Sequence, residues 1–459
     1  MENMKTKIIP CENTARYHLY WVYFIAYGAM ACFSPFFPHF MESRGLDYVQ
    51  IGYCFSLTSI VSIIAQPLWG YVSDKYYGKR KIIFALLIFC GLSAFGFLFS
   101  FSFAAIAFSV ILLTFFQGAV FPLADSYVYS ISSDFPAVQY GRVRLFGSAG
   151  FGITAFLLGI LLSYFNVSLM FIAYFGFMAV AAYFFLGAKF SEKVHGATPH
   201  FREIGKILKN KTYLIFVLTV CVSSIATVSS GNYIAILVEK TGGNTASLGF
   251  LWLLVAFSEL PLFYYGTFLL NRFGESRLYI AAMVLYALRF FASSLCTNFI
   301  PVVIIQLLQA FTFPLFMLAT TSKANRLLPD HLKATGMTLM TSLGYGLGGL
   351  IGNISGGYIL KYLDVFYLYK IYALICVLAL CIKFFVKKGD PEFLQGRLFY
   401  TFGPASFISS QIPQNFFKFS AKSAASFLAV FSYFALSVHV LIGVRISEGT
   451  PGHSVGTSI

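Results

Sequence analysis

Twelve stretches of about 20 mostly apolar residues constrain the fold of this chain more than any other feature of its sequence. About 20 apolar residues are needed for a helix to cross the hydrocarbon layer of a membrane. With 58% hydrophobic and 11% charged residues, the 459-residue chain has too few polar side chains for an ordinary soluble domain. The membrane-spanning helices that we expect are, roughly, 17–38, 50–72, 82–100, 104–132, 144–165, 169–188, 212–238, 246–270, 278–296, 301–322, 334–360 and 365–386.

The twelve expected helices fall into two sets of six, separated by a polar and basic loop. We therefore expect an all-α membrane protein with an N-terminal six-helix bundle at 1–188, a cytoplasmic central loop at 189–211 and a C-terminal six-helix bundle at 212–388. The residues before Tyr17 are polar and lack the pattern of a cleaved signal peptide. The first helix is therefore expected to direct its own insertion.

Basic residues predict how the helices are oriented in the membrane. If the N-terminus is cytoplasmic, 23 of the 32 Lys and Arg residues lie in cytoplasmic segments. The loops on the other side then hold only Arg44, Lys240, Lys361 and Lys370. Because cytoplasmic loops carry an excess of Lys and Arg, we expect a multi-pass protein of the cell (plasma) membrane with a cytoplasmic N-terminus.

The net charge of +15 does not indicate nucleic-acid binding, because the basic residues stand in short groups between apolar stretches and form no basic domain. The eight Cys residues lie mostly within the expected helices, without a CxxC motif or clustered His residues. We expect them to be packing residues. The expected partners are a small-molecule substrate and the lipid bilayer, with the monomer as functional unit, no metal and no cofactor other than a proton as coupling ion.

Two short sequences recur in the second set of helices. QGAVFP at 117–122 matches QAFTFP at 309–314, 192 residues later, and SAGFG at 148–152 matches SLGYG at 342–346, 194 residues later. Several matches in nearly constant register indicate an internal repeat. Parallel repeats of six helices, with a site between them at the depth of the membrane midplane, are the architecture of alternating-access transporters.

A loop motif follows the second expected helix. A glycine lets neighbouring helices approach, a carboxylate caps or pairs near a helix end, and basic residues hold the loop in the cytoplasm. The motif residues, which we expect to act in conformational change, are Gly70, Asp74, Lys75, Gly78 and Arg80. A degenerate second copy occupies 266–277.

This motif, with six plus six helices, resembles the major facilitator superfamily over residues 15–388. PFFP at 35–38 and YGRVRLFG at 140–147 are similar to the lactose permease branch. FPLAD at 121–125, and LGFLW at 248–252 with Glu259, are similar to the phenylpropionate permeases of that branch. The resemblance implies secondary transport by rocking of two six-helix bundles.

Asp125, Arg142 and Arg144 lie unusually deep for ionisable groups, at the junction of the fourth and fifth expected helices. Such groups are costly in a membrane unless they are paired or hydrated, which makes them candidates for function. The resemblance implies that Asp125 and Arg144 bind substrate. The alternative is that they form a pair that only locks the two helices together. Arg142 is expected to contact a loop or lipid headgroups.

Glu259 and Arg289 lie in the middle of the eighth and ninth expected helices. The resemblance implies a glutamate that binds substrate and proton and an arginine that takes part in coupling. Burial favours the protonated form of a carboxyl group, which suits a group that gains and loses a proton. The alternative is a purely structural bond between the two side chains.

The sequence departs from the lactose permeases at several site positions. Gln309 and Thr312 stand where those permeases have a coupling histidine and glutamate, and Phe151 stands where they have a tryptophan that stacks on galactosides. Any proton coupling is therefore expected to involve Asp125 and Glu259. The further candidates for the substrate and coupling site are Phe151, Gln117, Gln309 and Thr312, and the aromatic residues that could line it are Tyr23, Tyr27 and Tyr345. His39 is expected to lie at the membrane interface.

The sequence predicts a proton symporter that imports a small organic solute, such as a saccharide or a nucleoside. One alternative is a permease for an aromatic or other organic acid, and another is a non-transporting receptor or a lipid-modifying enzyme. An enzyme would need a nucleophile with its base, or a metal cluster, and the sequence has neither spacing.

The tail at 389–459 has no counterpart in the repeat. Its residues 424–444 are apolar enough for a thirteenth membrane span, which would place the C-terminus outside the cell. The alternatives are an interfacial helix or a segment foreign to the transporter. We expect the tail to be poorly ordered, and deletion after Lys388 to leave transport intact.

Overall fold

The computed structural model describes residues 10–135, 138, 140–188, 207, 209–328 and 333–386. The described helices belong to one compact unit, Met1–Gly389. The predictions for most of the central loop, for the tail and for its apolar stretch at 424–444 lie outside the described residues.

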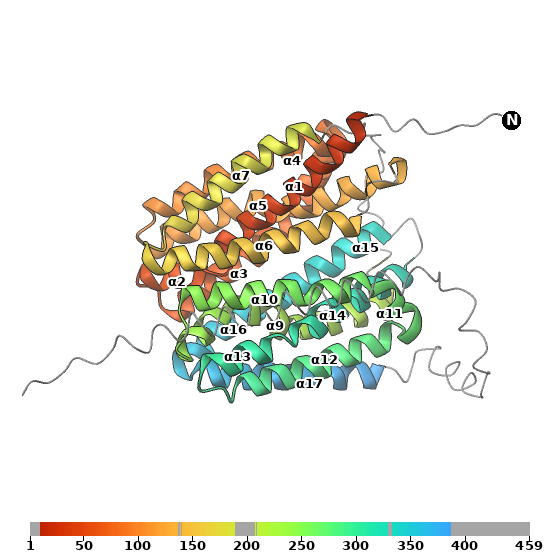
Figure 1. Ribbon diagram of the computed structural model, residues 1–459. Coiled ribbons are helices and arrows are strands. Elements are labelled where there is room, and N and C mark those ends of the chain that lie inside the picture. Colours follow the sequence, from red (N-terminus) through yellow and green to blue (C-terminus); the bar gives the residue numbers. More distant parts are fainter. Residues whose placement is uncertain are drawn as a thin grey trace, which may run out of the picture. The chain divides into compact units, whose positions relative to one another are not determined.

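The first bundle contains the six spans that precede the central loop (Figure 1). Its helices are α1 (Pro10–Phe33), α2 (Phe37–Ser43), α3 (Tyr48–Val72), the π-helical turn η1 (Ser73–Tyr77), α4 (Lys79–Ala94), the 3-10 helix η2 (Phe95–Phe99), α5 (Phe103–Asp134), α6 (Tyr140–Tyr164) and α7 (Leu169–Gly187). Each long helix starts within about four residues of the start of its predicted span, except α1, which begins seven residues before it.

The second bundle lies beside the first, and several of its spans are broken into shorter helices (Figure 1). Its helices are α9 (Lys211–Lys240), α10 (Thr245–Tyr264), α11 (Gly266–Phe273), α12 (Glu275–Ser293), α13 (Phe299–Gln306), α14 (Gln309–Arg326), α15 (Lys333–Leu339), η4 (Met340–Gly346), α16 (Leu347–Tyr362) and α17 (Val365–Val386). The described residues contain no strand, which agrees with the all-α prediction.

Eleven helical stretches among the described residues are long and apolar enough to cross a membrane. The remaining predicted span, 334–360, is present as the consecutive helices α15, η4 and α16. This span is rich in glycine, which lowers its hydropathy and allows close packing. A Cβ atom at Gly357, for example, would lie 2.6 Å from the carbonyl oxygen of Tyr48 in α3.

The internal repeat is visible in the backbone at matching helix starts. Gly78 precedes α4 with φ 78° and ψ 151°, and Gly274 precedes α12 with φ 74° and ψ 158°. A positive φ is easily adopted only by glycine. The same turn therefore closes the loop motif at 70–80 and its degenerate copy at 266–277.

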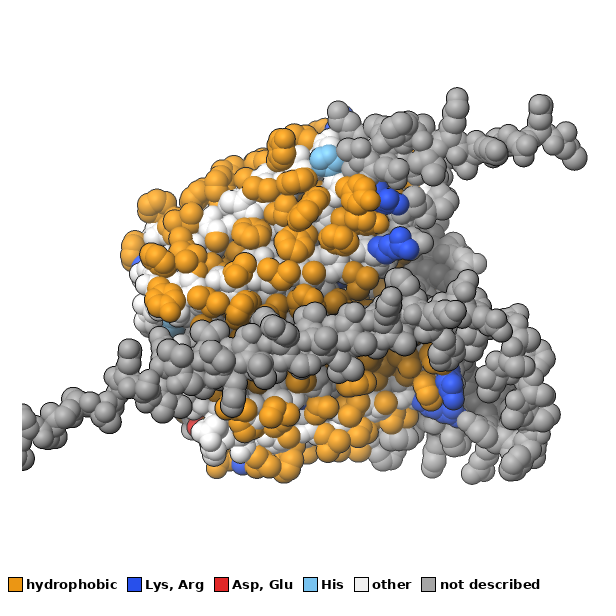
Figure 2. All heavy atoms as spheres, in the orientation of Figure 1, with side chains coloured by type: hydrophobic (Ala, Val, Ile, Leu, Met, Phe, Trp, Pro, Cys, Tyr) orange, Lys and Arg blue, Asp and Glu red, His pale blue; other side chains and the backbone are white. Residues whose placement is uncertain are grey.

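The two ends of the bundles differ in charge. The starts of α4, α6 and α12 lie at one end, called the basic end below, with Lys79, Arg142 and Arg277. Figure 2 shows apolar side chains over the flank of the molecule and most of the visible Lys and Arg residues gathered at one end. This is the surface of a protein that is surrounded by lipid along its sides.

The two bundles meet mainly along two helix pairs, α3 with α16 and α6 with α10, and α2 also contacts α9. At the end opposite the basic end, the hydroxyl groups of Tyr53 and Tyr358 lie 2.7 Å apart, and Lys361 Nζ lies 3.4 Å from Asp47 Oδ2. Between α6 and α10, a Cβ atom at Gly249 would lie 2.4 Å from the carbonyl oxygen of Ala155. The bundles are therefore packed backbone to backbone at this opposite end.

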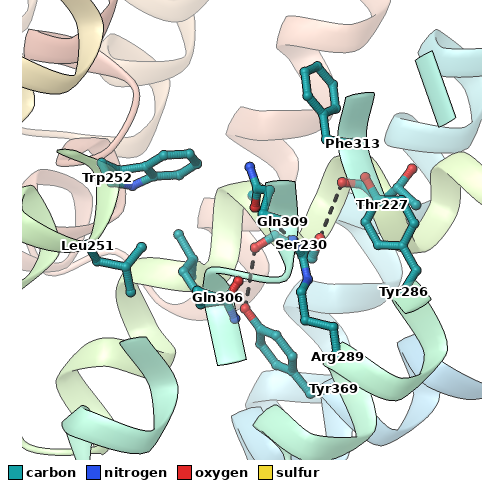
Figure 3. Close-up of a pocket in the computed structure, with 12 residues that line it drawn as sticks. Thr227, Ser230, Leu251, Trp252, Tyr286, Arg289, Gln306, Gln309, Phe313 and Tyr369 are labelled. Carbon is teal, nitrogen blue, oxygen red and sulfur yellow. Dashed lines mark hydrogen bonds between the residues drawn. The ribbon is translucent and has the colours of Figure 1, made fainter. Parts of the chain in front are cut away.

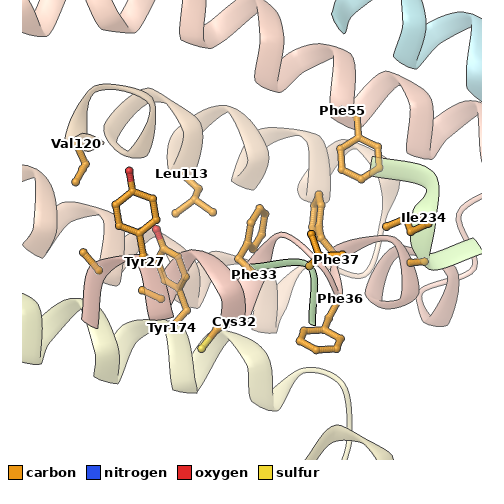
Figure 4. Packing of buried hydrophobic residues seen from close by; sticks show 14 of the residues in the cluster. Tyr27, Cys32, Phe33, Phe36, Phe37, Phe55, Leu113, Val120, Tyr174 and Ile234 are labelled. Carbon is orange, nitrogen blue, oxygen red and sulfur yellow. The ribbon is translucent and has the colours of Figure 1, made fainter. Parts of the chain in front are cut away.

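Aromatic side chains support the same end from within the first bundle. Phe37 follows the break between α1 and α2 and packs edge-on against Phe55 of α3, with ring centroids 5.9 Å apart (Figure 4). Phe55 in turn lies 5.9 Å from the ring of Tyr233 in α9. The core of the first bundle is thus continuous with that of the second bundle.

Candidate functional site

The first bundle carries a polar group built on α1, α5 and α6. The hydroxyl group of Tyr23 donates to Oδ1 of Asp125 at 2.7 Å, and the Tyr23 ring stacks on Tyr27 with 5.9 Å between centroids. The Cζ atom of Arg144 lies 4.3 Å from the centroid of the Tyr27 ring, which is a cation–π contact. Gly147 makes room for that ring, because a Cβ atom there would lie 2.7 Å from it.

Asp125 and Arg144 are close enough to interact electrostatically. None of the described ion pairs joins them, however, and the link between the two charges runs through Tyr23 and Tyr27. Within the described residues, no hydrogen bond of Arg144 is found, so its N–H groups are available to a ligand. Arg142 is exposed at the start of α6 and takes no part in this group.

The second bundle carries a hydrogen-bonded network built on α10, α12 and α14. Gln309 Nε2 donates to Glu259 Oε1 at 3.1 Å, while Arg289 Nη1 donates to Gln309 Oε1 at 2.9 Å. The same Nη1 atom donates to Thr312 Oγ1 at 3.1 Å. Glu259 is 9% exposed and Arg289 is 4% exposed, so both charges are buried. The structure thus brings four predicted site residues together.

A cavity of about 50 Å³ lies next to this network (Figure 3). Three buried polar atoms of its lining residues lack a hydrogen-bond partner in the described structure: Arg289 Nε, Trp252 Nε1 and Thr227 Oγ1. Buried polar groups are rarely left unpaired, so such atoms indicate a place for water or ligand. Five lining residues were not among the site residues predicted from the sequence: Thr227, Ser230, Gln306, Tyr286 and Tyr369.

The two polar groups act on each other across the contact between α6 and α10. Arg144 interacts electrostatically with Glu259 as well as with Asp125. Phe151 of α6 packs edge-on against Trp252 of α10, with ring centroids 5.6 Å apart and planes at 75°. The candidate site therefore has one wall from each bundle.

Two other predicted site residues share no described hydrogen bond with these groups. Gln117 is half-buried on α5, and none of the described hydrogen bonds connects it to Asp125 or to Glu259. Tyr345 shares a hydrogen bond of 2.8 Å with Thr320 and packs against Phe316 inside the second bundle.

The loop motif lies at the basic end. Arg80 Nη2 donates to the carbonyl oxygen of Leu186 at 3.2 Å, which ties the start of α4 to the end of α7. Lys75 Nζ donates to the hydroxyl group of Tyr71. Gly70 lies in α3, whereas the side chain of Asp74 lies outside the part of the chain that is described.

Two bundles of apolar helices long enough to cross a membrane, with buried or partly buried charges in each, are typical of a membrane transporter of the major facilitator type. Residues 17–371 match the model of the MFS_1 like family, and the chain belongs to that family. The resemblance to the major facilitator superfamily is confirmed. This family consists of transporters, so the protein is a multi-pass membrane transporter and not an enzyme.

The most similar proteins include sugar permeases. The maltose permease of Geobacillus stearothermophilus is 24% identical over 372 residues, which cover 81% of this chain and 93% of the permease. The lactose permease of Klebsiella oxytoca is 24% identical over 328 residues, which cover 67% of this chain and 78% of the permease. These similarities support the lactose permease branch that the sequence motifs predict.

A similar solved structure is that of a mutant of the nucleoside transporter NupG. It superposes with a TM-score of 0.71 at 15% sequence identity and covers 80% of this chain and 99% of NupG. At this identity the match establishes the fold alone.

Proposed function

We propose that this transporter is a proton symporter that imports a small solute with several hydroxyl groups, a saccharide or a nucleoside, by alternating access. The observation that carries the proposal is the presence of two polar groups on neighbouring bundles: Arg144 near Asp125 through Tyr27 and Tyr23, and Glu259 joined to Arg289 through Gln309. A solute bound at Arg144 would contact both walls of the site. The basic end faces the cytoplasm in this proposal, in accordance with the excess of positive charge inside.

The chemistry of the site suits a neutral polyol. Asp125 and Glu259 accept hydrogen bonds, whereas Arg144, Arg289 Nε and Trp252 Nε1 are donors without a hydrogen-bond partner among the described residues. A hydroxyl group both donates and accepts, so a saccharide or a nucleoside can use both sets. Before a proton binds at Glu259, the two carboxylates balance the two guanidinium groups, so the site has no net charge to attract an organic anion. The similarity to maltose and lactose permeases points to the same class.

The proton is proposed to bind at Glu259. Its carboxyl group is buried and is held by the neutral amide of Gln309 and not by a direct ion pair with Arg289. A carboxylate that is locked to a buried guanidinium group is costly to neutralise, because the cation is then left unpaired. The intervening amide lowers this cost and allows Glu259 to change its charge during a transport cycle.

The proposed cycle requires the bundles to separate at one end and then at the other. The contacts of Tyr53 with Tyr358 and of Gly249 with Ala155 close the end opposite the basic end. The cavity beside Arg289 has about 50 Å³, against about 300–1,000 Å³ for a typical ligand pocket. A cavity of this size does not hold a saccharide or a nucleoside, so the helices around Arg289 would have to move before a solute could occupy it.

A binding screen with the purified protein tests the proposed substrate class. Thermal unfolding is followed in detergent with sugars, nucleosides and phenylpropionate-like acids, because a ligand that binds the folded state raises Tm. We expect a rise with a saccharide or a nucleoside and none with the acids. A rise with the acids alone would assign the site to organic anions, and the proposal for a neutral solute would be wrong.

A further inference from the structure

Three side chains with metal-binding atoms converge at the end opposite the basic end. They are His39 and Glu42 of α2 and Glu239 near the end of α9, and one ligand atom from each lies within 4.8 Å of the others. His39 and Glu42 are partly exposed and Glu239 is exposed, so the cluster is open to ions from solution. None of these residues belongs to the central site between α6 and α10.

The charges around this cluster favour a cation. Glu42 and Glu239 interact electrostatically with each other, and both act on Tyr48, as does Asp364. Lys240 also acts on Glu42, but a single ammonium group balances only one of the two cluster carboxylates. Two carboxylates at such short range repel each other unless a proton or a cation lies between them.

We propose that His39, Glu42 and Glu239 form a site for a divalent transition-metal ion, with Zn²⁺ as the representative ion. Zinc accepts imidazole nitrogen and carboxylate oxygen at about 2.0–2.2 Å, and in open sites water takes the fourth position. Ligand atoms of a tetrahedral ion are then about 3.3 Å apart, so the three side chains reach this geometry by small rotations. Ca²⁺ and Mg²⁺ prefer all-oxygen sites, and the imidazole disfavours them.

The site connects the two bundles, because α2 belongs to the first bundle and α9 to the second. Nearby, Lys361 of the second bundle pairs with Asp47 of the first at 3.4 Å. An ion with ligands from both bundles binds best when the bundles touch at this end. By linkage, the bound ion stabilises the closed arrangement by the same free energy by which closure strengthens zinc binding. Zinc at the end opposite the basic end should therefore slow opening. Only this consequence for transport rests on the proposed function.

Titration calorimetry with ZnCl2 tests the site on the full-length protein in detergent after treatment with EDTA. We expect one ion per chain for the native protein and at least tenfold weaker binding for His39→Ala and for Glu239→Gln. Asp47→Asn is the matched control, since it removes a carboxylate at the same end that lies outside the cluster. His18→Ala controls for a histidine elsewhere on the chain.

The outcome is read together with a check of folding. Each variant must elute as a single species in size-exclusion chromatography and keep the native Tm without zinc. A variant that fails this check is replaced by Glu42→Gln. Equal zinc affinity in the native protein and the cluster variants, or no binding to the native protein, would overturn the site. Zinc should raise the Tm of the native protein but not that of the cluster variants.

Transport provides a separate test of the linkage. External zinc should slow solute exchange by the native protein at least fivefold and leave His39→Ala unaffected. Zinc binding without slower exchange would overturn the linkage and leave the site in place. If no tested solute is transported, the proposed function fails, but calorimetry and Tm still decide whether the zinc site exists.

Discussion

Arg144 is the proposed substrate ligand of the first bundle, on the helix α6 that packs against α10 of the second bundle. Its guanidinium group contacts the Tyr27 ring at 4.3 Å. The direct ion pair with Asp125, which was the structural alternative for these residues, is absent from the described ion pairs. We therefore propose that Arg144 binds substrate, and the alternative is that it only locks α5 and α6 together.

Replacement of Arg144 tests its role as a substrate ligand. A hydrogen bond to a charged group contributes about 1.5–3 kcal/mol, so Arg144→Ala should weaken solute binding at least tenfold. Arg142→Ala, an exposed position on the same helix, should leave binding within about twofold. The measurement is the dissociation constant of the solute found in the thermal screen. Equal affinity in both variants would leave Arg144 with a packing role only.

Replacement of Glu259 tests the proposed coupling. Glu259→Gln keeps the shape of the side chain and the contact with Gln309 but holds no exchangeable charge. Accumulation driven by a pH gradient should be lost, while exchange of solute across the membrane persists. Radiolabelled uptake and exchange in the same vesicles separate the two activities. Undiminished accumulation in this variant would remove Glu259 from the coupling step.

The sequence indicates which charged residues lie within the membrane spans, but not which hydrogen bonds join them. Asp125, Arg144, Glu259 and Arg289 stand out because ionisable groups are costly within apolar stretches. The bridging role of Gln309 and the orphan donors of Trp252 and Thr227 depend on packing between helices far apart in the chain. Uncharged residues such as Ser230 and Tyr369 give no comparable signal, because most Ser and Tyr residues of such a chain serve packing.

At the scale of helices, α6 and α10 can approach closely because glycine, which has no side chain, stands at the contact. A Cβ atom at Gly249 would lie 2.4 Å from the carbonyl oxygen of Ala155 in the other bundle. Gly249→Ala should therefore hinder closure at the end opposite the basic end and reduce transport at least fivefold, because overpacking costs about 1–3 kcal/mol. The measurement is the initial rate of solute exchange in vesicles.

Gly176→Ala is the matched control for this contact. Nothing lies within 4 Å of a Cβ atom at Gly176 in α7, so the variant should keep the native rate and a Tm at least as high. If Gly249→Ala transports as well as Gly176→Ala does, the close contact of α6 and α10 is not needed in the cycle.

The positions of the helices followed well from the apolar stretches, since length and hydropathy limit where a chain can cross a membrane. The breaks that divide a span into two shorter helices could not be predicted from the apolar stretches. The second bundle interrupts its spans between α10 and α11, between α13 and α14, and within the glycine-rich stretch at 333–362. These breaks are set by packing, as at Gln309, where the start of α14 presents the amide to Glu259.

At the scale of the whole molecule, the contacts between α3 and α16 predict that one end must open during transport. The Tyr53 and Tyr358 hydroxyl groups, 2.7 Å apart, mark that contact. With the native cysteines replaced, Tyr53→Cys combined with Tyr358→Cys should be joined by a short bifunctional thiol reagent, and exchange should fall below about a tenth of the untreated rate. The Tyr53→Cys variant alone should be unaffected by the reagent. Full exchange after cross-linking would exclude rocking at this contact.

The central claim is that solute and proton cross the membrane together in one transporter. Its most direct test is the pH outside proteoliposomes that contain the native full-length chain, recorded when the solute identified by the thermal screen is added without a pH gradient. We expect an alkaline shift outside that depends on the solute, is absent from protein-free vesicles and is lost in Glu259→Gln. Solute uptake by the native protein without any change in external pH would contradict it.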